Sequence, residues 1–188
     1  MLFSFKINCC ILFLFLLTFV RASAQNTSFT FPKGPFRFAG KNELNPLSEK
    51  KYLVISFISP DCPLCQKYSS TINELITTFS SDSIDFVGIV PGKYHTEKKV
   101  LQYIKEFTVK QPLLLDQQLR WVKALKATIT PEVFLINTTS GQIIYSGAID
   151  NWAIDVSKKR PQPTIFYLKE GLNSIVNQTI PKINHSPA

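Results

Sequence analysis

The sequence has few cysteines and histidines and no long apolar run, and these shortages limit the classes of protein to which it can belong. The longest apolar stretch, Cys9–Val20, is about twelve residues long, whereas a helix that spans a bilayer needs roughly twenty. No repeats or low-complexity tracts appear. The chain is therefore expected neither to cross a membrane stably nor to form a repeat array.

The same apolar stretch belongs to a segment that is typical of a secretory signal peptide, residues 1–24. Lys6 provides a positive start, the apolar run follows, and Ala22-Ser23-Ala24 supplies the small residues that a signal peptidase requires. Cleavage would leave Gln25 as the first residue of an exported protein. A retained membrane anchor is the alternative interpretation, and the shortness of the apolar run argues against it.

The part that follows the signal peptide has the length of one ordinary domain with a sizeable core. We expect an N-terminal extension over residues 25–50, a single folded domain over residues 51–180 and a C-terminal tail over residues 181–188. Nothing in the composition requires a second domain.

The chain carries a moderate excess of positive charge. Loss of Lys6 and Arg21 with the signal peptide lowers the formal net charge from +8 to +6. The basic clusters Lys98-Lys99 and Lys158-Lys159-Arg160 are short and lack interleaved aromatic residues. This pattern predicts a solvated face and no nucleic-acid partner.

Cleavage also removes two of the four cysteines and leaves Cys62 and Cys65. A disulfide between them would close too short a loop to remove much chain entropy, so a structural role explains little. A zinc site would need two more ligands, and neither His95 nor His185 has a suitable spacing. Thiols of exported proteins tend to be oxidised, so a lone C-x-x-C favours thiol–disulfide exchange without a cofactor or metal.

The cysteine pair lies where a predicted strand passes into a predicted helix. Residues 52–58 form a short apolar, β-rich run typical of a buried strand, and Ser59-Pro60-Asp61 ends it. Apolar residues then recur at steps of three and four, as on one helix face: Leu64, Tyr68, Ile72, Leu75, Ile76 and Phe79. We therefore expect Cys62 near the N-cap and Pro63 in the first turn, where proline costs no hydrogen bond.

This position would make Cys62 the attacking thiol. Free N–H groups and the positive end of the helix dipole favour the thiolate, which lowers the pKa of the first cysteine. Cys65, one turn later and less accessible, would resolve the mixed disulfide that forms on Cys62.

The remaining sequence alternates predicted strands and helices. Strands are expected at residues 84–90, 113–115, 132–136 and 142–145, the last two joined by a hairpin loop over 137–141. Helix faces are expected at Val100, Leu101, Ile104 and Phe107, at Leu119, Val122 and Leu125, and at Ile165, Leu168, Leu172 and Ile175. This order predicts an α/β fold, a mixed central sheet covered on both sides.

Three segments resemble the redoxin branch of the thioredoxin superfamily. They are Ser-Pro-Asp-Cys-Pro-Leu-Cys at residues 59–65, Ala-Thr-Ile-Thr-Pro-Glu-Val-Phe-Leu-Ile at 127–136 and Gly-Ala-Ile-Asp-Asn at 147–151. The sequence is similar to TlpA-like exported reductases and to peroxiredoxin-like proteins with a C-x-x-C, over roughly residues 52–177. The resemblance implies a thioredoxin-like three-layer fold with a central mixed β-sheet flanked by helices.

The resemblance also implies roles for residues and partners. The proline that matches Pro131 is cis in that family and lies beside the redox sulfurs, where the residue matching Thr130 offers backbone hydrogen bonds to a bound peptide. The alternative is that Pro131 only begins an edge strand. The implied activity is reduction of disulfides in partner proteins, with electrons from a membrane or soluble donor, in a bacterial periplasm or, alternatively, after secretion.

Two departures from the family leave alternatives open. Thioredoxins have a buried Asp six residues before the first active cysteine, where this chain has Ser56, so proton transfer from Cys65 has no assigned acceptor. Ser59 stands three residues before Cys62, as in thiol peroxidases, but Phe57 replaces the proline of that class. The alternatives are therefore a thiol peroxidase that uses Cys62, and a redoxin-fold binding protein without catalysis.

Overall fold

The computed structural model describes residues 30–33, 36–41, 44–45, 49–155 and 157–188. The expected signal peptide, residues 1–24, lies outside the described residues. None of the helices in the described part of the chain is both long enough and apolar enough to cross a bilayer.

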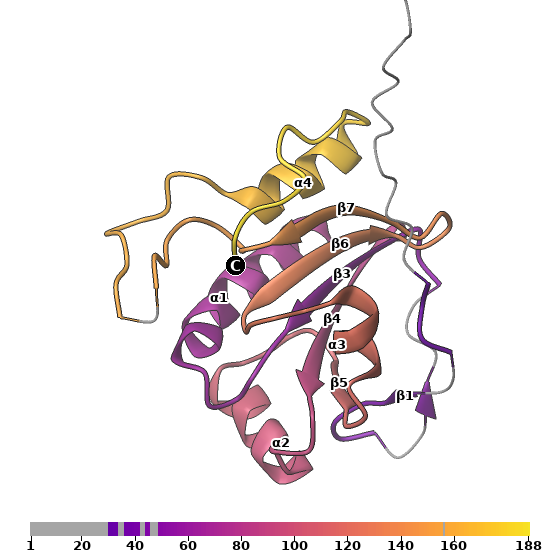
Figure 1. The fold of residues 1–188 in the computed structure, drawn as a ribbon, viewed down its shortest axis with the longest axis vertical. Helices are drawn as coiled ribbons and strands as arrows, with labels where there is room; N and C mark the ends of the chain where they lie inside the picture. Colours follow the sequence, from indigo (N-terminus) through magenta and orange to yellow (C-terminus); the bar gives the residue numbers. More distant parts are fainter. Residues whose placement is uncertain (1–29, 34–35, 42–43, 46–48, 156) are drawn as a thin grey trace, which may run out of the picture.

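Five strands form a mixed central sheet in the order β5-β4-β3-β6-β7 (Figure 1). The central strand β3 pairs in parallel with β4 and antiparallel with β6, while β5 extends the parallel side and β7 the antiparallel side. The strands are β3 (Tyr52–Phe57), β4 (Ile84–Pro91), β5 (Leu113–Asp116), β6 (Glu132–Asn137) and β7 (Gln142–Gly147). These bounds confirm the predicted α/β order, including the hairpin between the last two strands.

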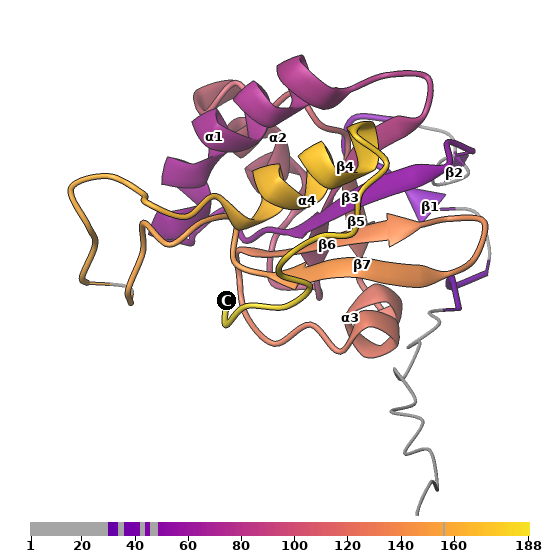
Figure 2. The same ribbon diagram turned by 90° about the horizontal axis from the view of Figure 1, so that it is seen from above.

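Helices cover both faces of this sheet, so the domain has three layers (Figure 2). Strand β3 contributes side chains to both faces of the sheet, because successive side chains of a strand point to opposite sides. Val54 packs with apolar residues of α1 (Pro63–Phe79) and α4 (Tyr167–Val176), whereas Leu53 and Ile55 pack on the side of α3 (Arg120–Leu125). Helix α2 (Glu97–Glu106) packs beside the start of α1, over β4 and β5.

The predicted helix faces are partly wrong. Leu119 lies before α3 (Arg120–Leu125) and is 38 % exposed, and Ile165 lies before α4 (Tyr167–Val176). Helix α2 begins after Thr96, whose side chain accepts the Lys99 N–H and so caps the helix. However, Leu101 is 41 % exposed, and the side chain that α2 buries beside Val100 is that of Tyr103. The hydroxyl of Tyr103 is hydrogen-bonded inside the fold. Burial of this side chain therefore costs less free energy than burial of an unpaired hydroxyl would.

The segments outside the predicted domain contribute to the fold at both edges of the sheet. Phe38 forms a bridge to β5, and Phe36 packs on the fully buried Trp121 with 5.4 Å between ring centroids. Phe36 belongs to β1 (Phe36–Arg37), which pairs antiparallel with β2 (Leu44–Asn45). At the opposite edge, His185 forms a bridge to Ser146 of β7. Covering both edges protects them from pairing with other chains.

Candidate active site

Cys62 is the N-cap of α1, at the turn that follows β3. Its backbone is extended, with φ −79° and ψ 116°, and its N–H donates to the Ser59 carbonyl at 3.0 Å. Pro63 occupies the first position of the helix, where its missing N–H would have had no partner. The predicted start of the helix at the first sulfur is therefore confirmed.

The Cys62 sulfur is half-buried and makes hydrogen bonds to backbone groups on two sides. It accepts the backbone N–H of Cys65 at 3.5 Å, and in its thiol form it donates to the Thr130 carbonyl at 3.3 Å. The pKa of Cys62 is lowered to about 5, chiefly because the Cys65 thiol donates to it, and burial opposes this shift. A thiol with this pKa is almost entirely thiolate at neutral pH, as a nucleophile in thiol–disulfide exchange requires.

Cys65 has the opposite properties. Its side chain is 3 % exposed, and its sulfur accepts the Ser59 N–H at 3.5 Å. The pKa of Cys65 is raised above the ordinary thiol range because its proton is shared with the Cys62 sulfur and because it is buried. The two thiols therefore form one coupled pair, in which the accessible sulfur holds the charge and the buried sulfur holds the proton.

The sheet brings Thr130 and Pro131 to the pair across a large distance in sequence. Phe57 at the end of β3 pairs with Glu132 at the start of β6, so the loops beyond these residues meet at one edge of the sheet. The Thr130–Pro131 peptide bond is cis. The Glu132 carboxylate accepts the Thr128 N–H at 2.8 Å and so holds the loop that presents the Thr130 carbonyl to Cys62.

A groove of about 470 Å³ runs from this loop toward the segment that links β7 to α4. It is bordered by Leu64 next to the cysteine pair, by Thr130 and Pro131, and by the half-exposed apolar side chains of Ile129 and Ile154. An apolar groove beside a reactive sulfur can hold an extended peptide segment.

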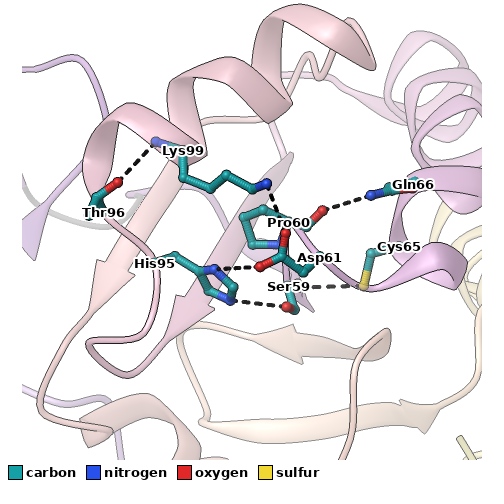
Figure 3. A network of polar contacts seen from close by, with 8 residues as sticks. All are labelled: Ser59, Pro60, Asp61, Cys65, Gln66, His95, Thr96 and Lys99. Carbon is teal, nitrogen blue, oxygen red and sulfur yellow. Dashed lines mark hydrogen bonds and ion pairs between the residues drawn. The ribbon is translucent and has the colours of Figure 1, made fainter.

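A second set of side chains lies on the other side of the turn, between the start of α1 and α2 (Figure 3). The Ser59 hydroxyl lies 3.1 Å from His95 Nε2, and His95 Nδ1 lies 3.4 Å from the Asp61 carboxylate. Lys99 also binds Asp61, at 2.9 Å, and its hydrogen bond lowers the pKa of that carboxyl. Asp61 is thus an exposed carboxylate that contacts both His95 and Lys99.

This grouping was not predicted, although the topology contains the signal for it. Strands β3 and β4 are parallel, so the residues that follow their carboxyl ends meet at one edge of the sheet. His95 follows the end of β4 closely, as Ser59 follows β3. The spacing of His95 from the cysteines was considered only for a zinc site. His95 follows Cys62 by 33 residues, so the sequence alone does not show that it lies beside the turn that contains Ser59.

Polar residues beneath Cys65 were also missed. Ser56 and Gln111 hydrogen-bond to each other in the interior, with 2.9 Å between the amide nitrogen and the hydroxyl. The hydroxyls of Ser69 and Tyr103 donate to the Cys65 carbonyl at 3.0 and 3.1 Å. Burial raises the pKa of Tyr103 to about 12, so this hydroxyl keeps its proton.

The fold and the site together are those of a thioredoxin-like protein. The chain belongs to the Redoxin family, whose family model matches residues 40–158, more than half of its length. No curated protein matches the sequence.

Solved structures share the fold at low sequence identity. An uncharacterized conserved protein from Geobacillus kaustophilus has a TM-score of 0.62 at 18% identity, covering 82% of this chain and 84% of that one. A thiol-disulfide isomerase from Corynebacterium glutamicum has a TM-score of 0.53 at 17% identity, over 64% and 85% of the two chains. StoA from Bacillus subtilis has a TM-score of 0.51 at 19% identity, over 60% and 84%. These similarities establish the fold.

The first testable prediction concerns the hydrogen bond between the two thiols. Cys65→Ala removes the donor and should move the pKa of Cys62 from about 5 toward the ordinary thiol value of about 8.5. Cys65→Ser keeps an O–H donor and should raise it less. The pH dependence of the rate of iodoacetamide alkylation gives the pKa of Cys62 in the unaltered protein and in both variants. An unchanged profile in Cys65→Ala would show that the sulfur–sulfur hydrogen bond is not the main cause.

Proposed function

We propose that the protein is an exported thiol–disulfide oxidoreductase that reduces disulfides of partner proteins through Cys62 and Cys65. The observation that carries this proposal is the division of roles within the pair: an acidic, accessible sulfur at a helix N-cap and a buried, protonated sulfur one turn later. Membership of the Redoxin family supports it.

The proposed reaction has two exchange steps. The Cys62 thiolate attacks one sulfur of a partner disulfide, forms a mixed disulfide and releases the other partner sulfur as a thiolate. Cys65 then loses its proton and attacks the Cys62 sulfur, which forms the Cys62–Cys65 disulfide and releases the second partner thiolate. Two electrons pass from the pair to the partner, and an external dithiol donor, membrane-bound or soluble, restores the reduced pair.

Thr130 and Pro131 are the proposed substrate-binding residues. The Thr130 carbonyl lies 3.3 Å from the Cys62 sulfur and accepts a hydrogen bond from it when Cys62 is a thiol, so a backbone N–H of a partner peptide would take this acceptor once the sulfur is in a mixed disulfide. The adjacent groove would then hold apolar side chains of the partner beside Ile129 and Ile154. Backbone hydrogen bonds with apolar contacts would accept many sequences, as a general reductase requires.

Variants of the two cysteines test this reaction. Cys62→Ser should reduce the rate of protein disulfide reduction to the uncatalysed rate, because the attacking sulfur is gone. Cys65→Ser should accumulate a mixed disulfide on Cys62, visible as a mass increase of the intact protein, whereas Lys67→Gln, an exposed change on the same helix, should be neutral.

Two further assays identify the alternatives. Rapid peroxide consumption that survives Cys65→Ser would indicate a thiol peroxidase. The structure gives this alternative little support, because the Ser59 hydroxyl is directed to His95. Biological activity that persists after both thiols are alkylated would indicate a binding protein without catalysis.

The direction of electron flow is tested by the reduction potential. A stabilised thiolate favours the reduced pair and by itself makes the potential more oxidising, and a pKa of about 5 lies between those of thioredoxin, about 7, and of the oxidase DsbA, about 3.5. The reducing direction therefore rests on the resemblance to TlpA-like exported reductases and not on this pKa. Titration against a glutathione buffer should give a potential nearer about −270 mV than about −120 mV. A value near the upper figure would reverse the assignment and make the protein an oxidant of its partners.

Export is part of the proposal and has its own test. The full chain expressed in a bacterial host should be recovered from the periplasm with a mass that corresponds to a first residue of Gln25, because Ala22-Ser23-Ala24 provides the cleavage site. Recovery of the uncleaved chain in the membrane fraction would favour the retained anchor, and recovery from the cytoplasm would contradict export.

A further inference from the structure

The chain between β7 and α4 forms an arm (residues 151–165 except 156) that projects beyond the sheet (Figure 1). The side chain of Asn151 closes the base of the arm, because its amide oxygen accepts the Thr164 N–H at 2.8 Å. Further out, Ala153 and Lys159 form an antiparallel bridge. The arm is therefore a folded element with its own hydrogen bonds.

The arm is fixed to the helix that carries the cysteine pair. The ring of Trp152 packs edge-on against Tyr68 of α1, with 5.5 Å between the ring centroids and 89° between the planes, a favourable aromatic geometry. The Tyr68 hydroxyl donates to Asp150 at 2.6 Å, and Asp150 also accepts the Trp152 N–H at 2.8 Å. Tyr68 lies one helical turn after Cys65, so these contacts hold the arm close to the redox site.

Arg160 of the arm lines the same groove as the proposed substrate-binding loop. The groove is bordered by Leu64 and Thr130 next to the cysteine pair and by Arg160 on the side of the arm. The Arg160 backbone N–H donates to the Trp152 carbonyl at 2.8 Å, and its guanidinium donates to the Asn151 carbonyl. These two bonds hold the half-buried guanidinium in place. A peptide that binds along Thr130 therefore shares one groove with a fixed cation.

No acidic side chain of the described residues forms an ion pair with Arg160. Two acidic residues line the groove, and each accepts other donors: Asp150 a hydroxyl and a backbone N–H, and Asp155 two N–H groups of its own turn. Lys158 and Lys159 add positive charge to the arm, in which Asp155 is the one acidic residue of the sequence. A guanidinium has five N–H donors and matches the geometry of a carboxylate.

We propose that the groove selects partner disulfides with a glutamate or aspartate close to the cysteine, and that Arg160 binds this carboxylate. The inference rests on the proposed function and adds a preference among its substrates. The Thr130 carbonyl would hold the backbone of the partner, and Ile129 and Ile154 would contact its apolar side chains. Arg160 is a specificity-determining residue in this scheme and takes no part in the exchange between sulfurs.

The test compares two peptide disulfides, each made of two copies of one peptide with a single cysteine. Glutamates surround the cysteine in the first peptide, and glutamines replace them in the second. The reduced protein is mixed with each disulfide in a single turnover, and the released peptide thiol is measured by chromatography. Division by the rate constant for dithiothreitol removes the difference in intrinsic reactivity between the peptides.

The unaltered protein should reduce the glutamate peptide at least about threefold faster than the glutamine peptide at low salt, as expected for a charge-assisted hydrogen bond in a partly exposed site. This ratio should fall as the salt concentration rises, because salt screens the charges. Arg160→Gln should bring the ratio close to one, and Arg160→Glu should lower it below one, because like charges repel.

Two further variants separate a direct contact from net charge and from a change in the arm. Lys158→Gln is the matched control: it removes one positive charge from the same arm, at a residue that does not line the groove, and should keep the ratio of the unaltered protein. Arg160→Lys keeps the charge without the planar donors and should give an intermediate ratio, whereas a disrupted arm would lose the preference altogether.

The outcomes distinguish this inference from the proposed function. Equal corrected rates for the two peptides in the unaltered protein would overturn the role of Arg160 and leave the oxidoreductase intact. The same holds for a fall of the ratio in Lys158→Gln as large as in Arg160→Gln. Failure of the unaltered protein to reduce either peptide would contradict the proposed function, and the preference with it.

Discussion

The hydrogen bond between the two thiols, made possible by a helix that begins at Cys62, is the interaction on which the rest of the site depends. The N-cap position places the Cys65 N–H and the Cys65 thiol on the same sulfur. One sulfur thereby becomes acidic and the other retains its proton. Burial alone would raise the pKa of both thiols, so this asymmetry comes from geometry and not from the polarity of the surroundings.

The topology of the sheet explains why the other parts of the site gather at this sulfur pair. β3 ends next to the carboxyl end of β4 and the beginning of β6. The loop after β4 carries His95, and the loop before β6 carries Thr130, so each reaches the turn that contains Ser59 and Cys62 from a different side. The cysteine pair thus has the Thr130 loop on one side and His95 on the other, separated by the turn itself.

The sequence was sufficient to predict the succession of strands and helices along the chain, the start of α1 and the meeting of the cysteine pair with the Thr130–Pro131 loop, because these follow from local apolar patterns and from a resemblance. It was insufficient where a buried polar side chain has its hydrogen-bond partner far away in the sequence. Tyr103 was not expected inside, because its buried position depends on Ser69 and the Cys65 carbonyl of another helix. Gln111 was not expected inside either, because its buried position depends on the hydrogen bond to Ser56. His95 was judged by its spacing along the chain, whereas its contacts depend on the alignment of two parallel strands.

The most direct test of this account is to follow the two cysteines separately by NMR, using the Cβ chemical shifts of the reduced protein as a function of pH. The account predicts that Cys62 titrates near pH 5 and that Cys65 stays protonated to a pH well above the ordinary thiol range. Titration of both cysteines near the ordinary value of about 8.5 would contradict it, because the helix N-cap would then leave the two sulfurs equivalent.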